Sequence, residues 1–218
     1  MSNRAHIMGF VGCVSYDIIH YLSRILCNMN KKVVLFDCSN NNALTNSISR
    51  PLELTESSII SYRDVDFSSN YQNELLNQYD YALIDFGINY NHDKIKSCDN
   101  LFLVTDLQLH HAINLRELYL SSSKQNVKII IRDVIKCKIK PDYITKLIGA
   151  NLFEEQYYVI YYDAMDTEYM LSCQYDNEFS FKKLSSIFKD MLYRILIDQC
   201  SLDRKEVTAA LKIAEKGE

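Results

Sequence analysis

The sequence predicts an α/β protein with a doubly wound, mostly parallel sheet that carries helices on both faces. Apolar segments alternate with amphipathic segments about every thirty residues, which is the order of repeated βαβ units. Segments 33–36 and 101–104 contain only apolar residues, which is typical of parallel strands buried on both faces. Gly and Pro are scarce, with 5 and 2 residues, and this argues against a loop-rich all-β fold.

The chain begins with one expected βαβ unit. A short strand at 7–11 is followed by a tight turn at 12–15, a helix at 16–29 and a second strand at 33–36. The helix has a core-facing stripe at helical spacing, made of Ile18, Ile19, Leu22, Ile25, Leu26 and Met29. His20 lies off this stripe, and we expect it at the surface.

The alternation continues to the end of the chain. Residues 38–58 are polar, and we expect a loop with one helical turn near 44–48. The later strands are expected at 59–62 on the sheet edge, 81–84, 101–104, 127–131 and 157–161. The later helices are expected at 70–78, 92–98, 107–120 and 141–149. Residues 163–176 are expected to form a loop before a long helix whose core-facing residues are Phe181, Leu184, Ile187, Phe188, Met191, Leu192, Ile195 and Leu196.

No linker, repeat or low-complexity block divides the chain, so we predict a single domain at 1–200. Residues 201–218 are expected to form a helical tail whose small apolar stripe consists of Val207, Ala210, Leu211 and Ala214. Because the stripe contains no Phe or Trp, membrane binding through it would be weak. Packing on the body of the protein or on a partner is favoured.

The composition restricts the class of protein. A net charge of −4 without a run of Lys or Arg makes a nucleic-acid binder less favoured. Seven cysteines, odd in number and without a CxxC pair, indicate reduced, mostly buried thiols and argue against a disulfide framework or a zinc site. We see no signal peptide and no apolar run long enough to span a bilayer, so we expect a cytoplasmic protein.

A ligand site in such a sheet is expected at the carboxyl ends of the strands. The turn at 12–16, Asp37, Asp85 and the loop at 105–110 all follow expected strands and should surround one crevice. The turn precedes a helix, and a helix N-terminus at this position binds phosphate in nucleotide-binding proteins.

Three stretches resemble the ParA/MinD family of deviant P-loop ATPases. They are KKVVLFD at 31–37, YDYALIDFG at 79–87 and CDNLFLVTDLQLHHAINLREL at 98–118. Their order and spacing follow that family over nearly the whole chain. The resemblance implies the family's P-loop NTPase fold. It also implies a role in partition, division-site placement or the positioning of secretion, pilus or conjugation machinery, and a C-terminal helix that binds membranes in some members.

The family's phosphate-binding loop, KGGxGKT[ST], is degenerate in this sequence. Counted back from 31–37, the loop lysine falls on Ser15, the magnesium-binding hydroxyl on Tyr16 and the signature lysine on Phe10. Among the loop glycines only Gly12 remains, since the other positions hold Val11 and Val14.

At the family's other functional positions, some residues are retained and others are replaced. Asp37 and Asp85 are kept, whereas the first switch aspartate is Ser39 and the adenine-contacting asparagine is Arg132. Phosphoryl transfer depends on positioned cations and a bound metal, so these changes remove the chemistry and leave the scaffold. We therefore expect no catalytic residue, no metal and no cofactor, with ATP and Mg²⁺ as the alternative.

Each position also has a structural explanation. Gly12 is favoured as a glycine required by a tight turn, and helix capping explains Ser15 as well as ligand binding does. Asp37 and Asp85 either bind a cation or cap loops. His110 and His111 lack a visible third ligand, so no metal site is expected there.

The resulting hypothesis is a non-hydrolysing interaction or localisation protein. We expect a homodimer formed across the crevice, with a further protein partner. The first alternative is a divergent ATP-binding ATPase of the same family, and the second is a DNA-binding partition protein.

Overall fold

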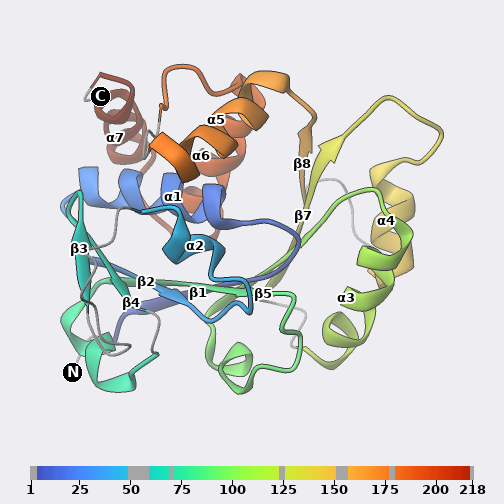
Figure 1. Cartoon of the computed structure of the whole chain (residues 1–218), viewed down its shortest axis with the longest axis horizontal. Coiled ribbons are helices and arrows are strands. Elements are labelled where there is room, and N and C mark those ends of the chain that lie inside the picture. Colours follow the sequence, from blue (N-terminus) through green and yellow to red (C-terminus); the bar gives the residue numbers. More distant parts are fainter. Residues whose placement is uncertain are drawn as a thin grey trace.

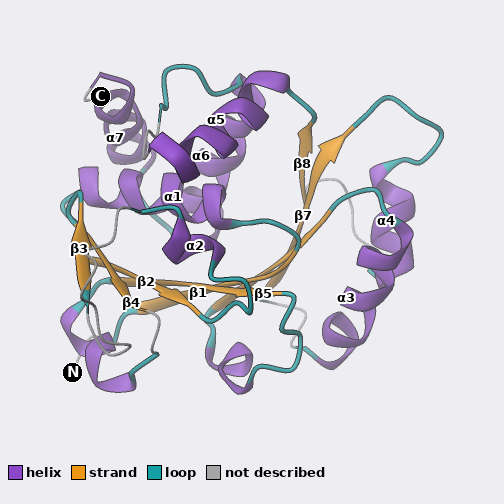
Figure 2. Cartoon of the chain, in the orientation of Figure 1, coloured by secondary structure: helices purple, strands orange, loops and turns teal. Residues whose placement is uncertain are grey.

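The computed structural model describes residues 4–48, 59–68, 71–122, 126–150, 157–176 and 180–216. This part of the chain forms one eight-stranded sheet covered by helices on both faces (Figure 1, Figure 2). The strands are β1 (His6–Gly12), β2 (Val33–Asp37), β3 (Ile60–Tyr62), β4 (Val65–Ser68), β5 (Tyr81–Gly87), β6 (Asn100–Thr105), β7 (Val127–Val134) and β8 (Tyr157–Tyr161). The predicted doubly wound α/β fold is confirmed.

The strand order is β3-β4-β2-β5-β1-β6-β7-β8. All neighbouring strands are parallel except β3 and β4, which pair antiparallel at one edge. β1 therefore lies in the middle of the sheet between β5 and β6. Its carboxyl end is flanked by the ends of both neighbours, which positions the crevice.

The helices are α1 (Tyr16–Asn28), α2 (Ala43–Asn46), α3 (Leu109–Ser121), α4 (Pro141–Ile148), α5 (Ala164–Asp176), α6 (Ser186–Cys200) and α7 (Arg204–Lys216), with 3₁₀ helices η1 (Asn73–Gln78) and η2 (Asp93–Ser97). One face of the sheet packs on α1, α2, α5, α6 and α7, and the other on α3, α4, η1 and η2 (Figure 1). Alternate residues of the central strands enter the two cores, as the two-residue period of a strand requires.

The predicted apolar stripe of α1 is largely confirmed. Its five residues from Ile18 to Leu26 are fully buried, and Met29, just after the helix, is half-buried against the same core. His20 was wrongly expected at the surface, because it is buried beneath α2. Its Nε2 lies 2.5 Å from Ser47 Oγ, and burial lowers the pKa of His20 to about 3.

Two elements were missed by the sequence analysis. β4 is a four-residue strand that contains a charged residue, Asp66, and this breaks the apolar pattern. Residues 163–176, expected as a loop, contain α5, which has only a few buried side chains and hence no strong apolar stripe. Asp163 caps the start of α5 by accepting from the backbone N–H groups of Met165 and Asp166.

The C-terminal part of the chain packs on the body. Val207, Ala210 and Ala214 of α7 are buried, and α7 lies against α1. The apolar stripe of α7 therefore packs within the molecule. Ile213 is the large apolar side chain of α7 that remains exposed. None of the helices in the described part is both long and apolar enough to cross a lipid bilayer.

Two smaller expectations were wrong. Ile187 was expected in the core-facing set of α6 but is 44% exposed, whereas Phe181 and Leu184 are buried ahead of the helix. The seven cysteines are free thiols, as expected, but only Cys173 is buried and the other six are half-buried.

Candidate functional site

A cavity of about 340 Å³ opens at the carboxyl ends of the central strands. It is lined by the turn at 12–16, by the loop after β2 and the start of α2, by the end of β5, by Asp106 after β6, by His111 of α3 and by the end of β7. The structure thus brings the 12–16 turn, Asp85 and the 105–110 loop to one crevice. Asp37 lies beside Asp85 in the sheet, but it is not among the described residues that line the cavity.

Gly12 is required by a close approach of two strands. Its φ of +126° is a conformation that L side chains rarely adopt, and a Cβ on it would lie 2.0 Å from the carbonyl oxygen of Val104 in β6. The next residue, Cys13, donates its backbone N–H to the same carbonyl at 2.8 Å. The β1–α1 turn is therefore fastened to β6, which accounts for Gly12 without any ligand.

Asp85 is a buried carboxyl group at the end of β5. Its Oδ1 accepts from the Gly87 backbone N–H at 2.8 Å and from Ser15 Oγ at 3.2 Å. Burial raises the pKa of Asp85 to about 7, and these two bonds offset only part of that effect. Ser15, at the N-cap position of α1, makes no side-chain bond to the helix backbone, so its expected capping role is replaced by this bond to Asp85.

Asp37 has a structural role in the loop that follows β2. Its two carboxylate oxygens accept from the backbone N–H and hydroxyl of Ser39, at 3.1 and 2.5 Å, and from those of Thr45, at 2.7 and 2.6 Å. Four donors occupy the carboxylate and fold residues 38–45 back over the strand end. The loop-capping explanation thus holds for Asp37, and Ser39 is one of the groups that it caps.

Tyr16 lines the cavity, but its hydroxyl is used elsewhere. Tyr16 OH donates to the Met170 carbonyl of α5 at 2.7 Å. This bond holds α5 over the start of α1, and it directs the only polar atom of the Tyr16 side chain to a protein partner.

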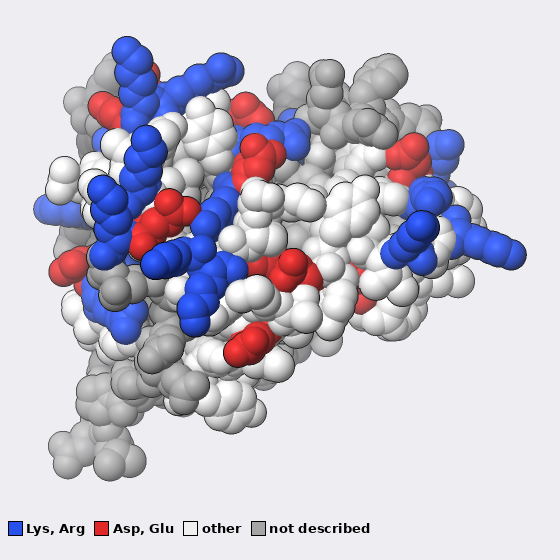
Figure 3. Space-filling model, turned by 90° about the horizontal axis from the view of Figure 1, so that it is seen from above, with Lys and Arg blue, Asp and Glu red and all other residues white. Residues whose placement is uncertain are grey.

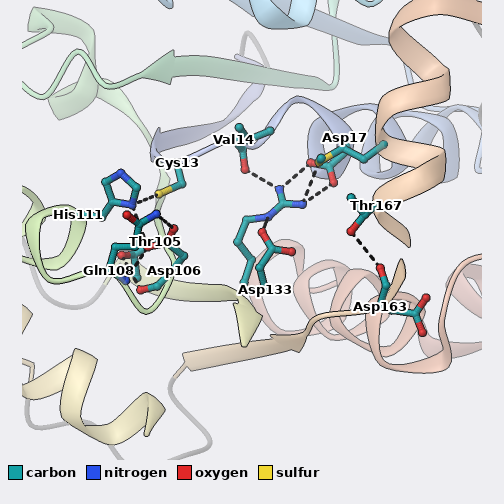
Figure 4. A network of polar contacts seen from close by, with 12 residues as sticks. Cys13, Val14, Asp17, Thr105, Asp106, Gln108, His111, Asp133, Asp163 and Thr167 are labelled. Carbon is teal, nitrogen blue, oxygen red and sulfur yellow. Dashed lines mark hydrogen bonds and ion pairs between the residues drawn. The ribbon is translucent and has the colours of Figure 1, made fainter. Parts of the chain in front are cut away.

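Arg132 at the end of β7 makes the strongest polar contacts in the crevice. Its guanidinium forms a two-pronged ion pair with Asp17 of α1, with both N–O distances at 2.9 Å, and Nη1 also donates to the Val14 carbonyl at 2.6 Å. Nε donates to Asp133 at 3.1 Å. Figure 4 shows Val14, Asp17 and Asp133 converging on this guanidinium. Arg132 and Asp17 are nearly inaccessible, with 6% and 2% of their side chains exposed.

The charges around the cavity are unfavourable for an anion. The lining includes the carboxyl groups of Asp85, Asp106 and Asp133 and, among the described residues, no lysine. Arg132 is the single arginine among the described lining residues, and its charge is balanced by Asp17 and Asp133. In the described part of the lining, a phosphate group at the start of α1 would meet these carboxylates and no uncommitted lysine or arginine.

The opposite wall of the cavity holds a cluster of a thiol, a carboxylate and an imidazole. His111 Nδ1 lies 3.1 Å from Cys13 Sγ and 2.8 Å from Asp106 Oδ1 (Figure 4). Burial, followed by the charge of Asp106, raises the pKa of the Cys13 thiol to about 12. Burial alone would raise the pKa of Asp106, but bonds from Gln108 and His111 outweigh it and lower that pKa.

The sequence analysis did not predict which side chains meet on either wall of the cavity. It singled out Arg132 and His111 separately, yet Asp17 is 115 residues from Arg132 and Cys13 is 98 residues from His111. The sequence did contain a signal for the second wall. Cys13 follows β1 and Asp106 follows β6, and these two strands are neighbours in the sheet, so their carboxyl ends lie side by side.

No protein-family model matches the sequence, and no curated protein matches it either. Solved structures match over nearly the whole chain. A ParA family ATPase from Chlorobium tepidum TLS is 15% identical with a TM-score of 0.52, covering 97% of this chain and 98% of that one. A chain of the MinC:MinD cell division protein complex from Aquifex aeolicus is 14% identical with a TM-score of 0.60, covering 88% and 96%.

A plasmid partition protein from Borrelia burgdorferi is 13% identical with a TM-score of 0.55, and the match covers 88% of this chain and 100% of that chain. At such low identity the likeness shows the fold and no more. The expected resemblance to ParA/MinD ATPases is therefore confirmed for the fold.

Proposed function

We propose that this chain is a non-hydrolysing protein of the ParA/MinD type. It acts as an interaction or localisation module that positions a bacterial secretion, pilus, conjugation or partition assembly. The observation that carries the proposal is the position of Arg132. The guanidinium binds the Val14 carbonyl in the turn where the family's loop would wrap phosphate, and it neutralises Asp17 at the start of α1.

ATP and Mg²⁺ do not fit the residues present. The position of the loop lysine holds Ser15, whose hydroxyl bonds Asp85, and the position of the metal-binding hydroxyl holds Tyr16, whose hydroxyl bonds Met170. Asp85 has a pKa of about 7, so near neutral pH it is partly protonated and a poor partner for hydrated magnesium. These contacts support the proposal that the polar groups of the crevice stabilise the fold and do not bind a nucleotide.

A thermal-shift series with ATP, ADP and Mg²⁺ tests the proposal against the alternative of a divergent ATPase. We expect no change in melting temperature up to millimolar nucleotide, because a ligand that does not bind the folded state cannot stabilise it. A ParA-type ATPase with an intact loop serves as the positive control.

Saturable stabilisation that requires Mg²⁺ would contradict the proposal. The variant Asp85→Asn, in the crevice, would then locate the binding, with Asp93→Asn as the matched control, since the Asp93 side chain is 77% exposed.

We also propose a homodimer that meets across the crevice. Large apolar side chains surround its mouth although they face solvent: Val14 is 46% exposed and Ile88 is 62% exposed. Exposed apolar groups around a concavity are a feature of protein–protein contact surfaces. Light scattering should show a dimer for the native chain and a monomer for Ile88→Asp. The matched control is Ile213→Asp on α7, a side chain that is 52% exposed on a helix that contributes nothing to this rim.

DNA binding is the second candidate, and one observation favours it. Figure 3 shows Lys and Arg side chains gathered on the side of the molecule where α7 lies, with Asp and Glu among them. α7 contributes Arg204, Lys205, Lys212 and Lys216 against Glu206 and Glu215. Retention of nonspecific duplex that falls steeply with salt, and that Lys205→Glu with Lys212→Glu weakens, would support this candidate. Absence of retention at low salt would eliminate it.

A further inference from the structure

Cys13, Asp106 and His111 lie on the side of the cavity next to α3, which we call the α3 wall. This cluster has the composition and spacing of a metal site. One atom each from Cys13, Asp106 and His111 lies within 4.8 Å of the other two, and the side chains come from the ends of two neighbouring strands and the start of α3. Thiolate, imidazole and carboxylate are the three side-chain ligands that zinc takes in proteins.

The distances are close to those of a tetrahedral zinc site. With Zn–S of about 2.3 Å and Zn–N or Zn–O of about 2.0–2.1 Å, tetrahedral angles place sulfur about 3.5 Å from nitrogen and nitrogen about 3.3 Å from oxygen. The corresponding separations are 3.1 Å for Cys13 Sγ and His111 Nδ1, and 2.8 Å for His111 Nδ1 and Asp106 Oδ1. His111 Nδ1 therefore needs to move away from each of the other two ligand atoms by about half an ångström to admit the ion.

We propose that Cys13 Sγ, Asp106 Oδ1 and His111 Nδ1 bind one zinc ion, with a fourth position open to the cavity. This site goes beyond the proposed function and does not depend on it. Binding replaces the proton on Cys13 Sγ with the metal, and that proton is released to water. The proton that His111 Nδ1 donates to Asp106 moves to Nε2 by exchange with water, so that Nδ1 can bind the ion. The Asp106 and His111 side chains are 21% and 27% exposed, so a water molecule can reach the fourth position.

The surroundings hold the carboxylate in place and favour a cation. Asp106 Oδ1 accepts from the Gln108 backbone N–H at 2.8 Å and Oδ2 from Gln108 Nε2 at 2.9 Å, which fixes the carboxylate as outer partners of metal ligands usually do. Arg132 is paired with two carboxylates, Asp17 and Asp133, so one negative charge in excess remains near the three ligands.

A thiol nucleophile activated by histidine and aspartate is the other arrangement that these residue types could form, and the geometry disfavours it. In such a triad the thiol and the carboxylate contact opposite nitrogens of the imidazole. Here both contact the same atom, Nδ1 of His111, which cannot accept from Cys13 while it donates to Asp106. All three ligand atoms lie within 4.8 Å of one another, as the ligands of one metal ion do.

Cobalt substitution of the full-length, reduced chain tests the site without any variant. Co²⁺ is added to metal-free protein in a phosphine reductant, and the absorption spectrum is followed against metal concentration. We expect one equivalent to produce a sulfur-to-cobalt charge-transfer band together with the intense visible bands of four-coordinate cobalt. One equivalent of Zn²⁺ should then abolish both.

Three ligand variants and two controls assign the bands to residues. Cys13→Ser should remove the charge-transfer band, and Asp106→Asn or His111→Ala should weaken Zn²⁺ binding by about 100-fold or more, since even outer-partner changes cost 10–100-fold. His110→Ala removes the neighbouring exposed histidine and Cys137→Ser removes another half-exposed thiol. Both controls should bind as the native chain does.

The proposal is overturned if the native chain gives no charge-transfer band with one equivalent of Co²⁺. It is equally overturned if Cys13→Ser keeps the band, or if His110→Ala and His111→Ala lose affinity alike. Circular dichroism establishes whether each variant is folded. If a variant is unfolded, the cobalt absorption spectrum of the native chain decides the outcome.

Discussion

The two walls of the crevice differ in how their polar groups are satisfied. On the α1 wall, Arg132, Asp17, Ser15 and Asp85 are buried and bonded to one another or to the backbone. On the α3 wall, Asp106 and His111 remain about one-quarter exposed. The polar groups of the first wall are thus satisfied within the protein, whereas those of the second remain accessible to a ligand. Changes on the first wall should therefore affect stability most, and changes on the second should affect binding.

The largest loss of stability is expected for Arg132→Met. It leaves the Asp17 carboxylate buried without its partner and removes a donor from the Val14 carbonyl, which should lower the free energy of unfolding by about 3–5 kcal/mol. Urea denaturation measures the effect. The control is Arg4→Met, which breaks an ion pair of similar length whose arginine is 51% exposed and should cost less than about 1 kcal/mol. Equal losses in the two variants would contradict the difference between the walls.

The next largest effect is expected for Gly12→Ala, at about 3 kcal/mol. The added Cβ would meet the Val104 carbonyl at 2.0 Å, and backbone on both sides leaves no side chain to move aside. Gly149→Ala is the matched comparison, because Gly149 also has a positive φ, +92°, but its Cβ would lie 3.3 Å from a Leu120 methyl group. We expect it to cost about 1 kcal/mol. If thermal or urea unfolding ranks the two variants in the reverse order, the close approach of β1 and β6 is not what Gly12 provides.

Asp85→Asn should stabilise the protein in a pH-dependent way. The pKa of Asp85 is raised from 3.8 to about 7, so between these values the folded chain holds a proton that the unfolded chain has released. Stability from this group is therefore complete below about pH 4 and is lost as the pH rises through 7.

The variant should consequently gain on the native chain as pH increases, by about 1.4 kcal/mol for each pH unit between the two pKa values. Urea denaturation from pH 4 to pH 8 measures the difference, with Asp93→Asn as an exposed control. A difference that is constant with pH would contradict the buried, protonated state of Asp85.

The smallest effect is expected on the α3 wall. In metal-free protein, His111→Ala removes one hydrogen bond from a partly exposed imidazole, because Nδ1 cannot bond Asp106 and Cys13 at once. The change should cost only about 0.5–1 kcal/mol. Adding Zn²⁺ should then widen the gap between native and variant, since only the native chain gains the binding free energy. A large loss without metal would show that this wall is structural too.

Much of the fold could be predicted from the sequence because the central strands are apolar at successive positions. Segments such as 33–36 and 81–84 are typical of buried parallel strands, and both lie within observed strands. Short edge elements carry a weaker pattern, which is why β4 was missed. His20 could not be placed from the helix alone, since what buries it is α2, which belongs to a later segment.

Less of the site could be predicted. Positions at strand ends are implied by topology, so the gathering of the 12–16 turn and Asp85 follows from the sheet. The hydrogen-bond partner of each side chain is not implied by topology, because Arg132 at the end of β7 and Asp17 at the start of α1 are 115 residues apart and meet only in the folded chain. Asp37 illustrates the same limit, since only the folded loop supplies its four donors.

We propose that the polar groups of the α1 wall serve the fold and do not bind a nucleotide. The most direct measurement is phosphate release from ATP with Mg²⁺, comparing the native chain with Asp85→Ala. We predict no turnover above background in either protein. Magnesium-dependent turnover by the native chain that Asp85→Ala abolishes would contradict the account.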